Sequence, residues 1–86
     1  MQLSLLPHHS PAAVAAIDWA VLTAGEARRL RELGLDEGVM VEVLHRARLG
    51  GGPIACRIGR MTIALRRSVA AAIRVESQPV FAEAAE

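Results

Sequence analysis

The chain has 86 residues, of which 52% are hydrophobic and only 2% aromatic, so it can form one small domain with an aliphatic core. Its formal net charge of +1 gives no electrostatic reason to expect binding to nucleic acid or to an anionic membrane. Its single cysteine, Cys56, excludes an internal disulfide and suits a reducing compartment.

The N-terminal segment gives no indication of secretion. Residues 1–7 carry no basic side chain, and Pro7-His8-His9 interrupts the apolar residues, so a signal peptide is not expected. The next apolar run, residues 12–22, contains Asp18 and is too short to span a bilayer. We therefore expect a cytoplasmic protein with no direct membrane insertion.

The first predicted element is a β-strand over residues 12–19. Val14, Ile17 and Trp19 supply the β-branched and aromatic side chains that are typical of strands. The alanines between them could equally propagate a helix, so both conformations stay open for this segment.

Residues 23–33 are predicted to form the one substantial α-helix. Thr23 and Glu26 have the spacing of a capping box, in which a hydroxyl and a carboxylate satisfy each other's backbone N–H groups. Ala27, Leu30 and Leu33 recur at helical spacing and form an apolar stripe. A helix this short needs a sheet to pack on.

Two glycines are predicted to shape the corner after this helix. Gly34 stands where a helix C-terminus favours a left-handed residue, and Gly38 stands where a turn leads into the next strand. We interpret both as structural turn residues.

The remaining residues predict short strands and tight turns. A strand is expected over 39–45, a glycine-rich connection over 49–53, and a hairpin of strands 54–58 and 61–65 joined by Gly59-Arg60. One helical turn over 68–72, capped by Ser68, and a closing strand over 73–75 follow. Five short strands in so small a chain favour a closed barrel, which leaves no exposed sheet edge.

The order of these motifs resembles the FeoA family, ferrous-iron transport protein A. The resemblance is carried by residues 29–38 (Arg-Leu-Arg-Glu-Leu-Gly-Leu-Asp-Glu-Gly) with the strand that follows, by the loop 47–53, by residues 63–67, and by the closing Ala, Ile and Val of residues 71–75. It covers about residues 12–76. It implies a mainly β fold, a small SH3-like β-barrel of about five strands with one α-helix and a short helical turn. The expected domain is residues 1–76, and residues 77–86 are expected to fray.

Metal binding is a weak hypothesis for this sequence. His8 and His9 are adjacent, so on a strand they would point to opposite sides, although in a turn they could converge with a carboxylate. No His/Cys spacing matches a structural zinc pattern. We expect no cofactor, and at most weak or adventitious binding of Fe(II) or Zn(II) at these low-priority metal candidates.

The sequence does not indicate an enzyme. Cys56 alternates with Ile54 and Ile58, which favours a small core residue over a reactive thiol. His45 has no evident partner for general base catalysis, and residues 50–52 lack the Lys-Ser/Thr of a phosphate-binding loop.

Partner binding is therefore the function that remains. Leu49 is either an exposed apolar anchor or a side chain folded back on the core. The arginines are either a basic docking patch for an acidic segment or scattered solvated side chains. The candidate partner-binding residues are Arg48, Leu49, Gly50, Arg66 and Arg67.

The resemblance implies a non-enzymatic accessory protein of bacterial ferrous-iron uptake. Its partner would be the membrane GTPase transporter, ferrous-iron transport protein B, bound at its cytoplasmic or GTPase region. A metal-responsive regulatory module, with possible association with nucleic acid, is the alternative hypothesis. No nucleic acid is expected as a partner under the first hypothesis, and a homodimer remains possible.

Overall fold

The computed structural model describes residues 1–46 and 52–77. Its strands are β1 (Ala12–Ile17), β2 (Met40–Arg46), β3 (Ile54–Ile58), β4 (Met61–Leu65) and β5 (Ile73–Ser77). The helices are α1 (Ala24–Glu32) and α2 (Arg67–Ala71), with 3-10 turns η1 (Leu3–Leu5) and η2 (Trp19–Val21). The predicted number of strands, the long helix and the short helical turn are confirmed. No helix within these residues is long and apolar enough to cross a membrane.

The five strands form one antiparallel sheet in the order β4-β3-β2-β1-β5. The sheet is curved but its two outer strands do not pair, so the prediction of a closed barrel without edges is wrong. The N-terminal segment pairs with the outer edge of β5, where a closed barrel would have paired β5 with β4. The N–H of Val75 in β5 donates to the carbonyl of Met1 at 2.7 Å, and Gln2 forms a bridge with Arg74.

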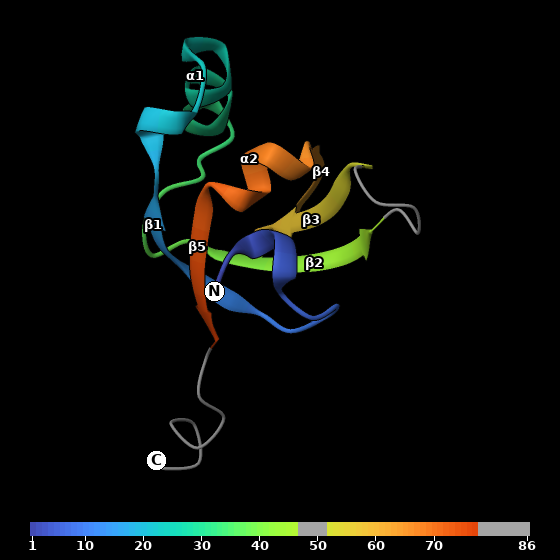
Figure 1. Cartoon of the computed structure of the whole chain (residues 1–86). Helices are drawn as coiled ribbons and strands as arrows, with labels where there is room; N and C mark the ends of the chain where they lie inside the picture. Colours follow the sequence, from blue (N-terminus) through green and yellow to red (C-terminus); the bar gives the residue numbers. More distant parts are fainter. Residues whose placement is uncertain (47–51, 78–86) are drawn as a thin grey trace.

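Residues 12–17 are a strand because they pair with β5 along their length, and Ala12 and Ala13 also pair with β2. This pairing outweighs the helical preference of the alanines. The strand ends at Ile17, earlier than predicted, since Trp19 begins the turn η2. In Figure 1, η2 leads up to α1, which stands at one end of the molecule above the sheet. The short helix α2 lies between α1 and the sheet.

The core is aliphatic, as the composition predicts. It includes buried side chains from every strand together with Leu30 of α1 and Val69 of α2. Leu3 and Leu6, which the sequence patterns did not assign to the core, are fully buried. Because the described residues contain one aromatic core neighbour, the half-buried Trp19, these two leucines supply volume that larger rings would otherwise fill.

Arg46 of β2 holds the N-terminal segment in place. Its Nε donates to the carbonyl of Ser4 at 3.0 Å, and its Nη2 donates to the carbonyl of Leu6. Hydrogen bonds from a guanidinium are stronger than neutral ones, and here they satisfy two carbonyls beside buried leucines.

The helix α1 begins and ends as its sequence predicts. The capping box is present, since Glu26 N–H donates to Thr23 Oγ1 at 3.0 Å and Thr23 N–H donates to Glu26 Oε1 at 2.9 Å. At the other end Gly34 has a φ of +80°. The N–H of Gly34 bonds to the carbonyl of Arg31, and the N–H of Leu35 bonds to that of Leu30, which is the pattern of a Schellman motif.

The short helix α2 differs from its prediction at its start. Arg66 occupies the N-cap and offers no side-chain cap, whereas Ser68 lies inside the helix. The predicted cap at Ser68 is therefore wrong. The strand β4 ends at Leu65 and α2 begins at Arg67, so Arg66 is the only residue between the strand and the helix. The helix therefore starts before Ser68.

We predict that Gly34→Ala destabilises the protein by about 1 kcal/mol, because an added Cβ is strained at a φ of +80°. The Cβ would meet no atom within 4 Å, so the cost is conformational only. Gly25→Ala, inside α1, is the matched control and should stabilise by about 0.5 kcal/mol. Urea unfolding curves of the two variants measure both effects, and equal shifts would contradict the left-handed helix end.

We also predict that Arg46→Met costs on the order of 2 kcal/mol, because it keeps the aliphatic stem and removes both hydrogen bonds to the N-terminal segment. Arg57→Met is the control. Arg57 lies 3.7 Å from Glu42 with a side chain 54% exposed, so its loss should cost less than about 1 kcal/mol. Thermal unfolding distinguishes the two, and comparable losses would show that Arg46 is no anchor.

Candidate partner-binding groove

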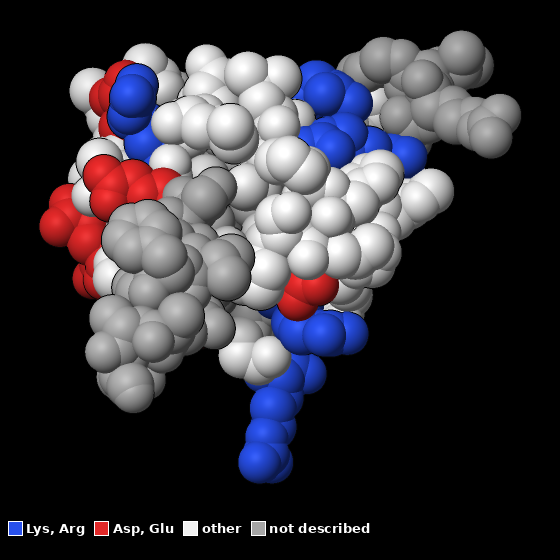
Figure 2. All heavy atoms as spheres, turned by 90° about the horizontal axis from the view of Figure 1, so that it is seen from below, with Lys and Arg blue, Asp and Glu red and all other residues white. Residues whose placement is uncertain are grey.

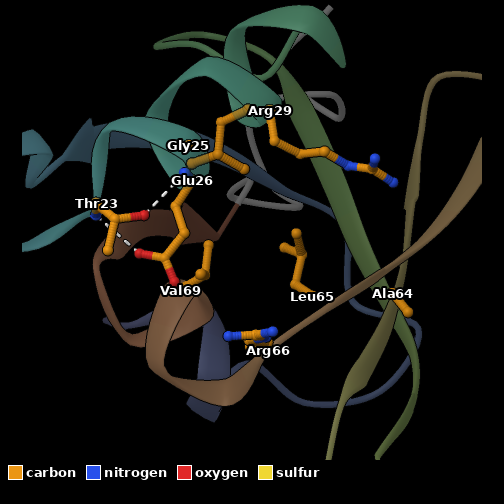
Figure 3. A pocket seen from close by; sticks show the side chains of 9 residues that line it. Thr23, Gly25, Glu26, Arg29, Ala64, Leu65, Arg66 and Val69 are labelled. Atoms are coloured by element: carbon orange, nitrogen blue, oxygen red, sulfur yellow. Dashed lines mark hydrogen bonds between the residues drawn. The ribbon is translucent and has the colours of Figure 1, made fainter.

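A groove lies between α1 and the segment that joins β4 to α2. We call it the α1–β4 groove, and its volume is about 520 Å³. Figure 3 shows α1 on one side and the end of β4 with the start of α2 on the other. Its lining residues are Thr23, Gly25, Glu26, Arg29, Leu30, Ala64, Leu65, Arg66 and Val69.

The floor of the groove is apolar. Leu30, Leu65 and Val69 belong to the core, with exposed fractions of 1%, 5% and 5%, and they come from three different elements. Thr23 Oγ1 and Glu26 Oε1 are used in the capping box of α1, which leaves Oε2 of Glu26 as the other carboxylate oxygen at the groove. Because the floor itself is apolar, it can receive an apolar side chain of another molecule.

Two arginines border this floor from opposite sides. Figure 3 shows Arg29 extending from α1 and Arg66 lying below, with Leu65 between them. Both side chains are exposed, and neither guanidinium has an ion-pair or hydrogen-bond partner among the described residues. A guanidinium carries five N–H donors in a planar arrangement that matches a carboxylate. The groove thus combines an apolar floor with two free guanidinium groups and one carboxylate, that of Glu26, so its charged lining residues have an excess of positive charge. This excess suits an acidic segment with an apolar side chain.

The structure divides the predicted partner-binding residues into two groups. Arg66 borders the groove, and Arg67 begins α2 beside it. The Nε of Arg67 is buried and has no acceptor among the described residues. Arg48, Leu49 and Gly50 lie outside the described residues, so their predicted role stays a prediction.

Arg29 and the apolar floor are the groove residues that the sequence did not indicate. Arg29 resembles Arg28 beside it in every local respect, yet only Arg29 lines the groove. Leu30 and Val69 are far apart in the chain and meet through the fold alone. Helical spacing identified Leu30 as a core residue, but no sequence signal indicated that its surroundings are partly open.

Two of the arginines considered for a basic patch have other contacts in the described part of the chain. Arg46 is committed to the N-terminal segment, and Arg57 pairs with Glu42. On the face seen in Figure 2, basic side chains form separate groups with uncharged surface between them. The arginine pair that borders the α1–β4 groove combines free charge with an apolar surface.

The two N-terminal histidines lie next to β2, since His8 forms a bridge with Val43. His9 adopts a φ of +60°, and its N–H donates to the carbonyl of Val43 at 2.8 Å. Its Nδ1 lies 3.5 Å from Glu42 Oε2, which is the convergence with a carboxylate that a turn permits. His8 and His9 are both exposed, and no group of three potential metal ligands occurs among the described residues.

Cys56 is a core residue of β3. Its exposed fraction is 0%, and its Sγ lies 3.9 Å from the carbonyl of Ile54. Burial raises the pKa of the thiol from 9.0 to about 11, and the nearby Arg46 lowers it only in part. A thiol that is neutral at physiological pH and shielded from solvent is a poor nucleophile. His45 is exposed at the end of β2, after a bulge between Val43 and His45.

Comparison with known proteins agrees with this fold. The chain matches the family model of the FeoA domain over residues 1–77. A search of the curated proteins found no match. Among solved structures, the zinc complex of FeoA from Stenotrophomonas maltophilia, a prokaryotic SH3 domain protein, is 38% identical with a TM-score of 0.73, covering 88% of this chain and 89% of that one. The predicted SH3-like fold is therefore confirmed.

Two further structures show how widely the fold is used. Iron(II) transport protein A from Clostridium thermocellum is 32% identical with a TM-score of 0.78 over 90% of this chain, which spans 45% of that chain. A manganese-dependent transcriptional repressor is 27% identical with a TM-score of 0.79 over 91% of this chain and 41% of its own. The same domain thus occurs both alone and as part of longer proteins.

We predict that the free energy of unfolding falls as the pH rises from about 9 to about 11. The neutral thiol of Cys56 is favoured in the folded state, so the unfolded chain loses this proton first and gains stability relative to the folded protein. The loss is on the order of 2 kcal/mol. The chain contains no tyrosine or lysine, so no other side chain titrates in this interval. Urea unfolding across this pH range measures the effect. Cys56→Ala should flatten the dependence, and an unchanged slope in that variant would contradict the assignment.

Proposed function

The chain belongs to the FeoA domain family, and from this premise we propose that it is a non-catalytic, cytoplasmic accessory protein of ferrous-iron transport. Its partner is the cytoplasmic or GTPase region of the membrane transporter, ferrous-iron transport protein B, whose activity it modulates. Family membership supports the role in ferrous-iron transport. The partner and the mode of action are the parts that we propose.

The α1–β4 groove is the observation that best supports binding of a protein partner. Its floor consists of core side chains, and its borders carry two arginines with no partner among the described residues. Interfaces gain most of their affinity where an apolar anchor is surrounded by charged groups that select the partner. An acidic stretch of the transporter would meet both requirements.

The alternative function, a metal-responsive module, has less support from the geometry. The manganese-dependent repressor shares the fold, but likeness of fold alone does not transfer metal binding or DNA binding. In the described part of this chain His9 lies 3.5 Å from Glu42, but no group of three potential metal ligands occurs. Calorimetry with Fe(II) or Zn(II) that gave stoichiometric binding, lost in a His8 and His9 double variant, would reverse this preference.

We predict that Arg29→Glu and Arg66→Glu each weaken binding to the transporter's isolated cytoplasmic region by about tenfold or more, because each places a like charge against an acidic segment. Arg28→Glu is the matched control, since it makes the same charge change on the same helix outside the groove. Isothermal titration calorimetry measures all three. Failure of the unaltered chain to bind would refute the proposed partner, and an equal loss in Arg28→Glu would exclude the groove as the contact.

The residues outside the described part can be tested in the same assay. Leu49→Asp weakens binding if Leu49 is an exposed anchor, which is one of the two arrangements that the sequence leaves open. Retained affinity in a folded Leu49→Asp variant would remove this loop, with Arg48 and Gly50, from the interface.

A further inference from the structure

The two outer strands of the sheet, β5 and β4, differ in whether another segment covers their free edge. The outer edge of β5 is covered by the N-terminus, since Met1 exchanges hydrogen bonds with Val75 and Gln2 forms a bridge with Arg74. The outer edge of β4 has no such cover among residues 1–46 and 52–77. An uncovered edge offers a row of backbone donors and acceptors to another chain.

The backbone groups that β4 offers can be identified from the hairpin. Gly59, with a φ of +61°, and Arg60 form a two-residue turn, which Ile58 and Met61 flank as a directly opposed pair. Residues that flank such a turn bond to each other, and the pattern alternates along an antiparallel ladder. Met61 and every second residue after it therefore bond to β3, whereas the N–H and C=O groups of Thr62 and Ala64 point outward. No described residue bonds to these outward groups.

This edge also lacks the features that usually prevent strand addition. β4 contains no charged residue and no proline, and it forms a regular ladder with β3, without a bulge. Natural proteins normally interrupt a free edge with one of these features. Their absence from β4 leaves an edge that is competent to pair.

The uncovered edge and the α1–β4 groove are continuous. Ala64 and Leu65 belong to β4 and also line the groove, and Arg66 follows directly. A strand added to β4 would therefore pass the apolar floor and the two free guanidinium groups of Arg29 and Arg66. Arg60 stands at the other end of the same strand.

The distribution of charge disfavours a second copy of this chain as the added strand. An antiparallel pair of β4 strands in which Thr62 of one copy pairs with Ala64 of the other is centred on Ile63. That register places Arg60 of each copy opposite Arg66 of the other. Like charges directly opposite each other in a sheet are destabilising, whereas carboxylates at those positions would be favourable.

We infer that β4 accepts an extended acidic segment of the partner protein as a sixth strand. The segment pairs with the outward backbone groups of Thr62 and Ala64, its carboxylates contact Arg29 and Arg66, and an apolar side chain rests on the floor of the groove. This deepens the proposed function and rests on it for the identity of the partner. The binding mode itself can be tested without the transporter.

Amide hydrogen exchange, followed residue by residue by NMR, tests the binding mode. In the free protein the amides of Thr62 and Ala64 should exchange at least about tenfold faster than that of Ile63. A short, end-blocked peptide of alternating valine and glutamate should slow them by about tenfold or more at saturation. The same peptide with lysine in place of glutamate should leave them unchanged.

Three outcomes would overturn the inference. Unchanged exchange with the glutamate peptide would exclude strand addition, and equal slowing by the lysine peptide would exclude selection by charge. Slow exchange in the free protein that depends on its concentration would assign the edge to a second copy.

A pair of variants links this edge to the transporter. Thr62→Pro removes one outward N–H that β3 does not use, whereas Thr62→Val keeps it at nearly the same side-chain volume. Thr62→Pro should weaken binding of the transporter's cytoplasmic region by about tenfold or more, with Thr62→Val unaffected. If Thr62→Pro does not fold, amide exchange of Thr62 and Ala64 measured in the complex of the unaltered chain with the transporter's cytoplasmic region replaces this test.

The failures of the two proposals are distinguishable. If the transporter region binds without protecting Thr62 and Ala64, the edge inference is wrong and the proposed function stands. If the glutamate peptide protects these amides but the transporter region does not bind, the site is real and the proposed partner is wrong.

Discussion

The hydrogen bonds of Arg46 to the N-terminal segment are the interaction on which the rest of this small fold depends. A core built almost wholly from Ala, Val, Leu and Ile needs many small contributions, and two fully buried leucines come from a segment outside the main strands. That segment also covers the edge of β5. By fixing it, one guanidinium on β2 serves the packing of the core and the protection of one sheet edge together.

The outer edge of β4 differs from that of β5 because the N-terminal segment covers only the edge of β5. A five-stranded sheet that does not close has two edges, and this chain has one N-terminal segment to cover them. The helix α1 stands beside β4 across a groove and does not seal it. The guanidinium groups of Arg29 and Arg66 on the borders of this groove attract an anionic occupant.

The features predicted correctly from sequence are those decided by residues close together in the chain. The Thr23 and Glu26 capping box, the Gly59-Arg60 hairpin and the left-handed end of α1 are local arrangements, each with its own residue preference. The errors concern relations between distant segments. Nothing near Leu3 or Leu6 indicates that they are buried, because the partners that bury them, including Arg46, lie about forty residues away. The groove escaped prediction for the same reason, since Leu30 and Val69 meet only in three dimensions. Closure of the barrel was inferred from strand count, which does not specify whether the first and last strands pair.

The contact between Trp19 and Arg31 makes the position of α1 observable. The guanidinium carbon of Arg31 lies 4.5 Å from the centre of the indole ring, and Trp19 is the only tryptophan in a chain without tyrosine. Indole emission responds to a neighbouring cation and to hydration, so this protein carries an intrinsic optical reporter between η2 and the helix that borders the groove. A ligand that moves α1 relative to Trp19 would therefore change the tryptophan fluorescence of the unlabelled protein.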